Sequence, residues 1–224
     1  MSKKSLKIIL NIIAIFAVFL FGILMLNTIA QYFSFRTDIG FLQFKQKVIH
    51  NQYWLSFFYV HIFSIVICLL AGLTQFSGQI LKNHKKLHRI FGKIYVYNVL
   101  FINFPACFIL AAFSNGGILG ISGFLVQNLL WGYFTVIAVL SIRKRDIFKH
   151  KNFMILSYSV TTTAITFRII KNLFYNETVF SYELFYGLNV WVSLLFNLGV
   201  AFLIISGNSK SLSLESNVIN KNKE

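Results

Sequence analysis

The sequence predicts an all-α polytopic membrane protein with six transmembrane helices and both termini in the cytoplasm. Of its 224 residues, 57% are hydrophobic and 12% are charged, whereas charged residues make up about a quarter of an ordinary soluble domain. The apolar residues gather in six runs, each close to the roughly 20 residues that a helix needs to cross the hydrocarbon core. Connections rich in Lys and Arg alternate with poor ones, as the positive-inside rule requires.

The six runs follow one another along the chain with short connections. They are expected at 8–26, 54–76, 90–113, 118–142, 153–174 and 184–205. The first run is longer than the apolar part of a secretory signal, so we expect a retained helix. Residues 31–53 are polar and should form a loop. Pro105 lies inside the third run, where it would kink the helix.

The chain has no linker long enough to divide it, so residues 1–206 are predicted to form one transmembrane domain. Residues 207–224 are rich in Ser, Asn and Lys and are expected to form a disordered cytoplasmic tail. Within the fourth predicted helix, Gly116, Gly120 and Gly123 share one face. Small residues at this spacing favour close approach of a neighbouring helix.

The formal net charge is +15, from 21 Lys and Arg against 6 Asp and Glu. With the N-terminus in the cytoplasm, 16 of the 21 basic residues fall on the cytoplasmic side. Arg36, Lys45 and Lys47 lie outside, and Arg168 and Lys171 lie in the fifth predicted helix. A nucleic-acid-binding module would gather its charges on one folded surface. We therefore expect the lipid bilayer of the cell's inner or plasma membrane as the partner, and no nucleic acid.

Polar side chains within the predicted spans indicate a polar interior, because hydrocarbon makes them costly. His61 and Gln75 share a stripe of the second helix, where they serve either packing or a ligand or proton-transfer role. Arg168 lies near the outer end of the fifth helix at a depth similar to that of His61. Glu183, which opens the sixth helix, can neutralise Arg168. The alternative is that Arg168 extends to the lipid headgroups.

His88 and His150 open the third and fifth predicted helices at the same depth. Two imidazoles on neighbouring helices are the ligands of a six-coordinate b-type haem, and the basic residues beside them favour its propionates. The chain lacks a CxxCH motif, so such a haem would be bound non-covalently. We therefore expect a redox protein that exchanges electrons with a quinone or small reductant near His61 and Arg168.

A zinc site is the alternative at the cytoplasmic ends of the third and fifth predicted helices. His84 and His88 are four residues apart, as are Asp146 and His150, so each pair shares a helix face. Three imidazoles and a carboxylate at one membrane level are suitable zinc ligands, which would make the protein a zinc-dependent membrane hydrolase. A third alternative is a small-molecule transporter or a structural membrane protein without a cofactor.

Residues 54–173 resemble a family of bacterial integral membrane proteins named domain of unknown function 2306. The resemblance is carried by Tyr-Val-His-Ile at 59–62, by His-Arg-x-x-Gly-x-x-Tyr-Val at 88–96, and by single residues of the fifth predicted helix. It brings no activity with it. It implies that the signature positions in this chain are His61, Gln75, His88, Arg89, Gly92, His150 and Arg168.

The sequence also resembles, more faintly, the six-helix transmembrane b-type cytochromes that pass electrons from ascorbate. Those proteins hold one haem between helices 3 and 5 near the cytoplasm, and the approach to His88 through Lys85 and Lys86 is similar. They hold a second haem between helices 2 and 4. Here His61 can supply a ligand on helix 2, but helix 4 offers only Gln127, so an outer haem of the usual form is not expected.

Overall fold

The computed structural model describes residues 23, 26–177 and 179–221, with side chains as far as 208. These residues are predominantly helical and include no β-strand, which confirms the all-α class. Five helices are long and apolar enough to cross a membrane: Gln52–Thr74, Lys85–Ala112, Gly117–Arg143, Ile147–Phe174 and Tyr182–Asn208. They correspond to the second to sixth predicted spans. The first predicted span, 8–26, lies outside the described residues except at its end.

The chain forms two compact units that meet between Asn98 and Val99, within the long helix Lys85–Ala112. The first unit contains η1 (Gln31–Ser34), η2 (Gly40–Lys45), α2 (Gln52–Thr74), α3 (Gly78–Asn83) and α4 (Lys85–Tyr97). From η3 (Asn98–Asn103) onward, the second unit contains α5 (Phe104–Ala112), α6 (Gly117–Arg143), α7 (Ile147–Phe174), η4 (Tyr175–Glu177) and α8 (Tyr182–Lys221). The helix α8 thus continues past residue 206, where the predicted domain ends.

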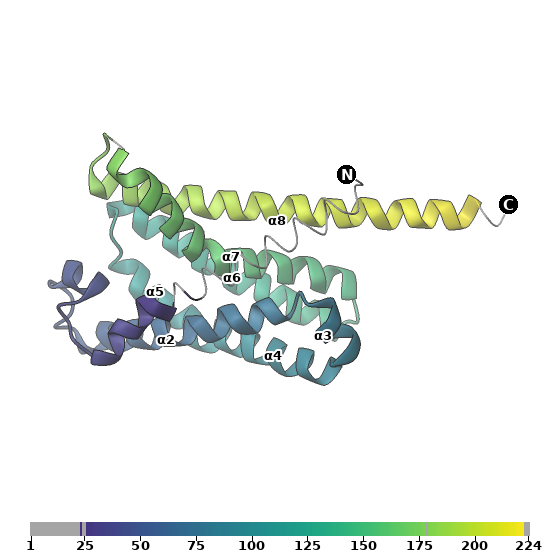
Figure 1. Ribbon diagram of the computed structural model, residues 1–224, viewed down its shortest axis with the longest axis horizontal. Helices are drawn as coiled ribbons and strands as arrows, with labels where there is room; N and C mark the ends of the chain where they lie inside the picture. Colours follow the sequence, from purple (N-terminus) through teal and green to yellow (C-terminus); the bar gives the residue numbers. More distant parts are fainter. Residues whose placement is uncertain (1–22, 24–25, 178, 222–224) are drawn as a thin grey trace. The chain divides into compact units, whose positions relative to one another are not determined.

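In the first unit, α2 and α4 lie side by side and the short helix α3 joins them (Figure 1). Side-chain caps define where these helices begin. The Asn51 side chain accepts hydrogen bonds from the first backbone N–H groups of α2, and Ser77 accepts one at the start of α3. The Asn98 side chain, directly after α4, donates to the carbonyl of Ser64 on α2 at 3.1 Å. This bond ties the two long helices together.

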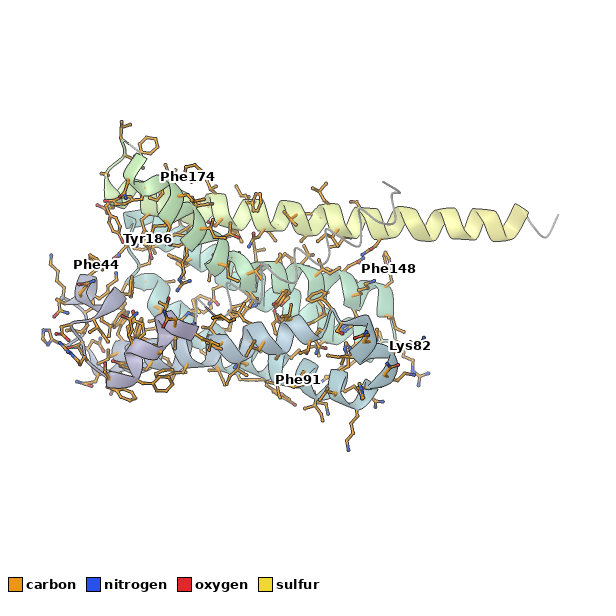
Figure 2. The ribbon with its side chains drawn as sticks, viewed as in Figure 1. Phe44, Lys82, Phe91, Phe148, Phe174 and Tyr186 are labelled. Carbon is orange, nitrogen blue, oxygen red and sulfur yellow. The ribbon has the colours of Figure 1, made fainter. Side chains whose placement is uncertain are left out.

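The predicted loop before α2 instead has a small core of its own. Its fully or nearly fully buried side chains are Tyr32, Leu42, Lys45, Ile49, Trp54 and Phe58. The prediction of a loop rested on the polar residues of the segment. It missed the apolar residues between them, which turn inward around the first two turns of α2. We call residues 31–51 the cap. Figure 2 shows Phe44 of the cap and Lys82 of α3 at opposite ends of the first unit.

Lys45 is a cation inside this cap, with only 6% of its surface exposed. Its ammonium lies 5.6 Å from the centre of the Phe41 ring, where the electron-rich face attracts a cation. Burial lowers the pKa of Lys45 below its usual range, because desolvation disfavours the charged form. The Tyr32 hydroxyl accepts the backbone N–H of Phe41 at 2.8 Å and fixes the same turn.

The helix Lys85–Ala112 contains a π-helical turn, η3, directly before Pro105. Proline has no N–H to donate and its ring crowds the preceding turn, so a widened turn at this place accommodates it. Two residues of α6 hold the chain just after this turn. Asn128 donates to the carbonyl of Phe104 at 2.9 Å, and the Phe104 ring packs so closely on Gly132 that a Cβ there would lie 2.5 Å from it.

In the second unit, α6, α7 and the first part of α8 run alongside one another (Figure 1). The predicted glycine face of α6 is confirmed as a packing face. A Cβ on Gly116 would lie 2.6 Å from the backbone of Gly187 on α8, and one on Gly123 would lie 2.7 Å from Val190. Gly120 fits under the carbonyl of Asn115. Small side chains let these helices approach closely.

Asparagine side chains fix the register between α7 and α8. Asn189 donates to the carbonyl of Phe167 at 2.9 Å, and Asn197 donates to that of Ser159 at 3.1 Å. Both spacings are eight residues, in opposite chain directions, as two antiparallel helices require. Thr166 in turn donates to the Asn197 side-chain oxygen at 2.8 Å. The polar groups in this interface therefore satisfy one another without water.

Replacing Gly116 by alanine should destabilise the second unit. Gly116 has φ of +90°, and its missing Cβ makes room for the Gly187 backbone. We expect Gly116→Ala to lower the free energy of unfolding by about 2 kcal/mol or more, since the strained backbone and the overpacking add. Reversible SDS unfolding in mixed micelles, followed by circular dichroism, measures this change. The matched control is Gly199→Ala, which has no neighbour within 4 Å and should not destabilise; equal losses would contradict the close-packing explanation.

Candidate functional site

His150 lies in the first turn of α7, where its ring reaches the neighbouring helix α6. Its Nδ1 lies 2.8 Å from the carbonyl oxygen of Ala138, whose small side chain leaves the backbone accessible. A carbonyl can only accept, so this contact requires Nδ1 to carry the proton. The lone pair is then on Nε2. Histidines that bind a metal are usually held in this manner, with one ring nitrogen donating to a carbonyl and the other available as a ligand.

His88 lies on α4 and is partly buried. Its backbone N–H donates to the carbonyl of His84, which is exposed at the junction of α3 and α4. One turn further on, Gly92 makes room for the Gln75 side chain at the end of α2; a Cβ on Gly92 would lie 2.9 Å from Gln75 Oε1. Arg89 is exposed. The structure therefore brings His88, Gly92 and Gln75 to one region of the first unit.

The junction of α3 and α4 forms a shallow depression beside His88. Its volume is about 390 Å³, and it is lined by Asn83, His84, Lys85, Lys86, Leu87 and Ile90. The two lysines give it a positive charge, and the two apolar side chains give it a hydrophobic wall. Such a surface suits an anionic group that is attached to an apolar body.

The polar stripe predicted on α2 is the packed face of that helix. Cys68 is fully buried and Gly72 is buried, while His61 and Gln75 are partly buried. The Ser64 hydroxyl donates to the His61 carbonyl at 3.2 Å and stays on its own helix. His61 thus lies on the side of α2 from which the interhelical contacts are made.

Asp146 acts as the N-cap of α7. Its carboxylate accepts the backbone N–H of Lys149 at 2.9 Å, which is the capping bond that a helix start requires. Across the residues that the structure describes, no group of three or more His, Cys, Asp or Glu side chains is arranged to hold a metal ion. The zinc site predicted at His84, His88, Asp146 and His150 therefore receives no support, because its carboxylate serves the helix.

Arg168 is exposed on α7, and its Nη1 donates to the Ala164 carbonyl one turn earlier at 2.9 Å. This bond holds the guanidinium against the preceding turn of α7, and the extension of Arg168 to lipid headgroups stays a prediction. The Glu183 carboxylate lies against the first residue of α6; a Cβ on Gly117 would be 2.7 Å from its oxygen. An anion is favoured at such a helix start. The pairing of Arg168 with Glu183 stays a prediction.

Aromatic side chains gather around the end of the second unit that contains Arg168. The Phe167 ring contacts that of Tyr186 at 4.8 Å, and Phe124 lies 6.2 Å from Phe167. Figure 2 shows Tyr186 of α8 and Phe174 of α7 at this same end. Rings at such distances pack edge to face or tilted and stabilise each other. They provide apolar ring surfaces at the end of the unit where Arg168 lies.

The residues that position these groups were not predicted from the sequence. Four asparagines donate to main-chain carbonyls of neighbouring helices: Asn98, Asn128, Asn189 and Asn197. Each stands within an apolar run, which is itself the signal that was overlooked, since an amide in hydrocarbon needs a partner. The acceptor for His150, the carbonyl of Ala138, is a backbone atom that no residue type marks.

These helices, polar contacts and apolar surfaces define an all-helical integral membrane protein. The chain belongs to the family described as predicted membrane protein (DUF2306), whose model matches residues 58–205. The match covers more than half of the chain and includes His61, His88, His150 and Arg168. It confirms the family that the sequence resembles and extends it to α8. No curated protein and no solved structure matches the chain.

Substitution of Asp146 distinguishes a helix cap from a metal ligand. We expect Asp146→Ala to lower the free energy of unfolding by about 1 kcal/mol, because α7 loses its capping acceptor. Asp146→Asn keeps an acceptor of the same shape and should leave stability nearly unchanged. Thermal unfolding in detergent measures both variants. A loss in Asp146→Asn as large as that in Asp146→Ala would show that the carboxylate has a role beyond the cap.

Proposed function

We propose that this protein crosses the inner or plasma membrane six times, with both termini in the cytoplasm. Five spans are described, and the sequence at 8–26 is apolar over a length that suits a sixth. The argument for orientation is the distribution of charge. Sixteen of the 21 Lys and Arg residues fall on one side of these spans, and cytoplasmic connections are the ones enriched in basic residues.

In this proposal the protein binds a b-type haem through His88 and His150 and acts in electron transfer. The observation that supports it is the contact of His150 Nδ1 with the Ala138 carbonyl at 2.8 Å, which holds the ring and, in a neutral imidazole, leaves the lone pair on Nε2. A haem so bound supplies reversible one-electron chemistry at its iron.

The residues around these histidines have the charges that such a group needs. Lys85 and Lys86 line the depression beside His88, and Lys149 and Lys151 flank His150. Ammonium groups pair with carboxylates, so these lysines would hold the haem propionates at the cytoplasmic surface. The apolar side chains of the spans would surround the macrocycle.

The electron donor or acceptor is proposed to be a quinone or small reductant near His61 and Arg168. Arg168 is an exposed cation near the end of α7, and its Nη1 donates to the Ala164 carbonyl. A guanidinium is a suitable donor to a carbonyl or an enolate oxygen. The aromatic rings of Phe167 and Tyr186 beside it offer an apolar surface for a planar ring.

Haem content of the purified protein tests this function. We expect a Soret absorbance and iron in the membrane-extracted protein, and both should be lost in His88→Ala and in His150→Ala. The matched control is His84→Ala, which removes the exposed histidine one turn before His88 and should keep the pigment. A colourless, iron-free protein that is folded by circular dichroism would refute the haem and would favour a transporter or a structural role.

A substitution at Ala138 should alter the absorbance spectrum of the haem through His150, although Ala138 itself is not a ligand. A leucine at this buried position would push the His150 ring from the carbonyl that holds it. We expect Ala138→Leu to convert part of the haem from a low-spin to a high-spin absorbance, because one ligand is displaced. Leu140→Ala, at an exposed position of the same helix, is the control. Identical spectra in all three proteins would exclude Ala138 as a positioning residue.

A further inference from the structure

Two exposed phenylalanines in the cap, Phe33 and Phe35, contact Tyr59 and Phe63 of α2. We call these four rings the aromatic ladder. Phe33 and Phe35 are 68% and 63% exposed, although both are apolar. The centre of the Phe33 ring lies 4.8 Å from that of Phe63, and the Phe35 ring lies 5.1 Å from that of Tyr59. Tyr59 and Phe63, one turn apart on α2, stack on each other. The four rings are therefore continuous.

The ladder lies alongside the membrane-spanning part of α2. Tyr59 and Phe63 follow the start of the helix at Gln52 by about 10 and 16 Å, at 1.5 Å per residue. The whole of α2 is roughly 33 Å long, close to the hydrocarbon thickness of about 30 Å. Phe33, which contacts Phe63, thus lies beside the middle of a span. An aqueous loop would lie beyond the end of that span.

Several backbone carbonyls around the ladder accept hydrogen bonds from within the same segment. The Gln31 amide donates to the Thr28 carbonyl at 2.7 Å, and the Ser34 hydroxyl donates to the Gln31 carbonyl at 2.8 Å. The backbone N–H of Phe35 donates to the Tyr32 carbonyl. Polar backbone groups in contact with hydrocarbon must be paired within the protein. These three bonds pair the carbonyls of Thr28, Gln31 and Tyr32, in and directly before η1, which would otherwise need water.

The next charges along the chain neutralise each other. Arg36 and Asp38 form a bidentate pair, with nitrogen–oxygen distances of 3.0 and 2.6 Å. Charged side chains that enter a membrane are commonly paired in this way. The pair directly follows Phe35 in the sequence and precedes the rest of the cap. It is suited to the headgroup layer, where both charges keep partial hydration.

We propose that the aromatic ladder is a lipid-contact surface, so that residues 28–38 lie within the bilayer and its headgroup layer. Phe33 and Phe35 would touch acyl chains, and the Arg36–Asp38 pair would lie among phosphates. The ladder is continuous with apolar side chains on the same side of α2, since Val60 and Ile67 are 46% and 50% exposed. That is the face that a span presents to lipid. The cap is thereby anchored to the membrane it projects from.

Spin labelling in lipid vesicles tests the proposal on the full chain. In a background where Cys68 and Cys107 are alanine, a nitroxide is attached to Phe33→Cys and, separately, to Phe35→Cys. Its collision rates with molecular oxygen, which concentrates in hydrocarbon, and with a water-soluble nickel chelate are measured by power-saturation EPR. Two positions are used because either substitution alone can weaken the ring contacts, and circular dichroism identifies folded samples.

Two further labels calibrate the measurement. Ile67→Cys, on the exposed face of α2, gives the lipid reference, and His50→Cys, exposed just before α2 begins, gives the aqueous reference. We expect labels at Phe33 and Phe35 to match Ile67, with an oxygen-to-nickel ratio several-fold above that at His50. A ratio like that at His50 would overturn the proposal in favour of a water-exposed loop. Low collision rates with both reagents would overturn it in favour of a protein partner.

Discussion

Amide side chains that donate to main-chain carbonyls of the next helix hold this structure together. One such bond joins α2 to the residue after α4, one joins α6 to α5, and two join α8 to α7. Lipid tails are as apolar as leucine, so apolar burial gives helices in a membrane little preference for one register over another. A buried amide without an acceptor is costly there. Each asparagine therefore selects one depth for its helix, and the side chains between these bonds meet their partners as a result.

Close helix approach follows from this registration. Because Asn189 and Asn197 fix α8 against α7, Gly187 arrives opposite Gly116 and the backbones of α6 and α8 can nearly touch. The position of His150 depends on the same geometry between α6 and α7, where the hydroxyls of Thr135 and Ser157 lie 2.7 Å apart. The Ala138 carbonyl then lies within reach of the imidazole. The orientation of the His150 ring, on which the proposed haem binding depends, is thus determined by helix packing at Thr135, Ala138 and Ser157.

The spans were predictable because one constraint, the absence of water, determines their length and composition. Their ends were not: the fifth begins at Ile147 instead of 153, because Asp146 caps it six residues before the apolar run. The cap was missed since its core rests on isolated residues such as Leu42 and Ile49, which follow no helical or strand period. Of the candidate site, the identities of His88 and His150 were evident from the sequence. The proton on His150 Nδ1 was not, because a backbone carbonyl decides it.

Because of the π-helical turn at Asn98–Asn103, the number of residues in this helix determines the direction in which its later side chains point. Such a turn amounts to one residue added to an α-helix, and each residue of an α-helix advances the chain by about 100°. The added residue sets the rotational phase of the α5 residues that follow it, among them Phe104, whose ring packs on Gly132 and whose carbonyl accepts from Asn128. At this place the fold depends on how many residues the helix contains, whatever their identity.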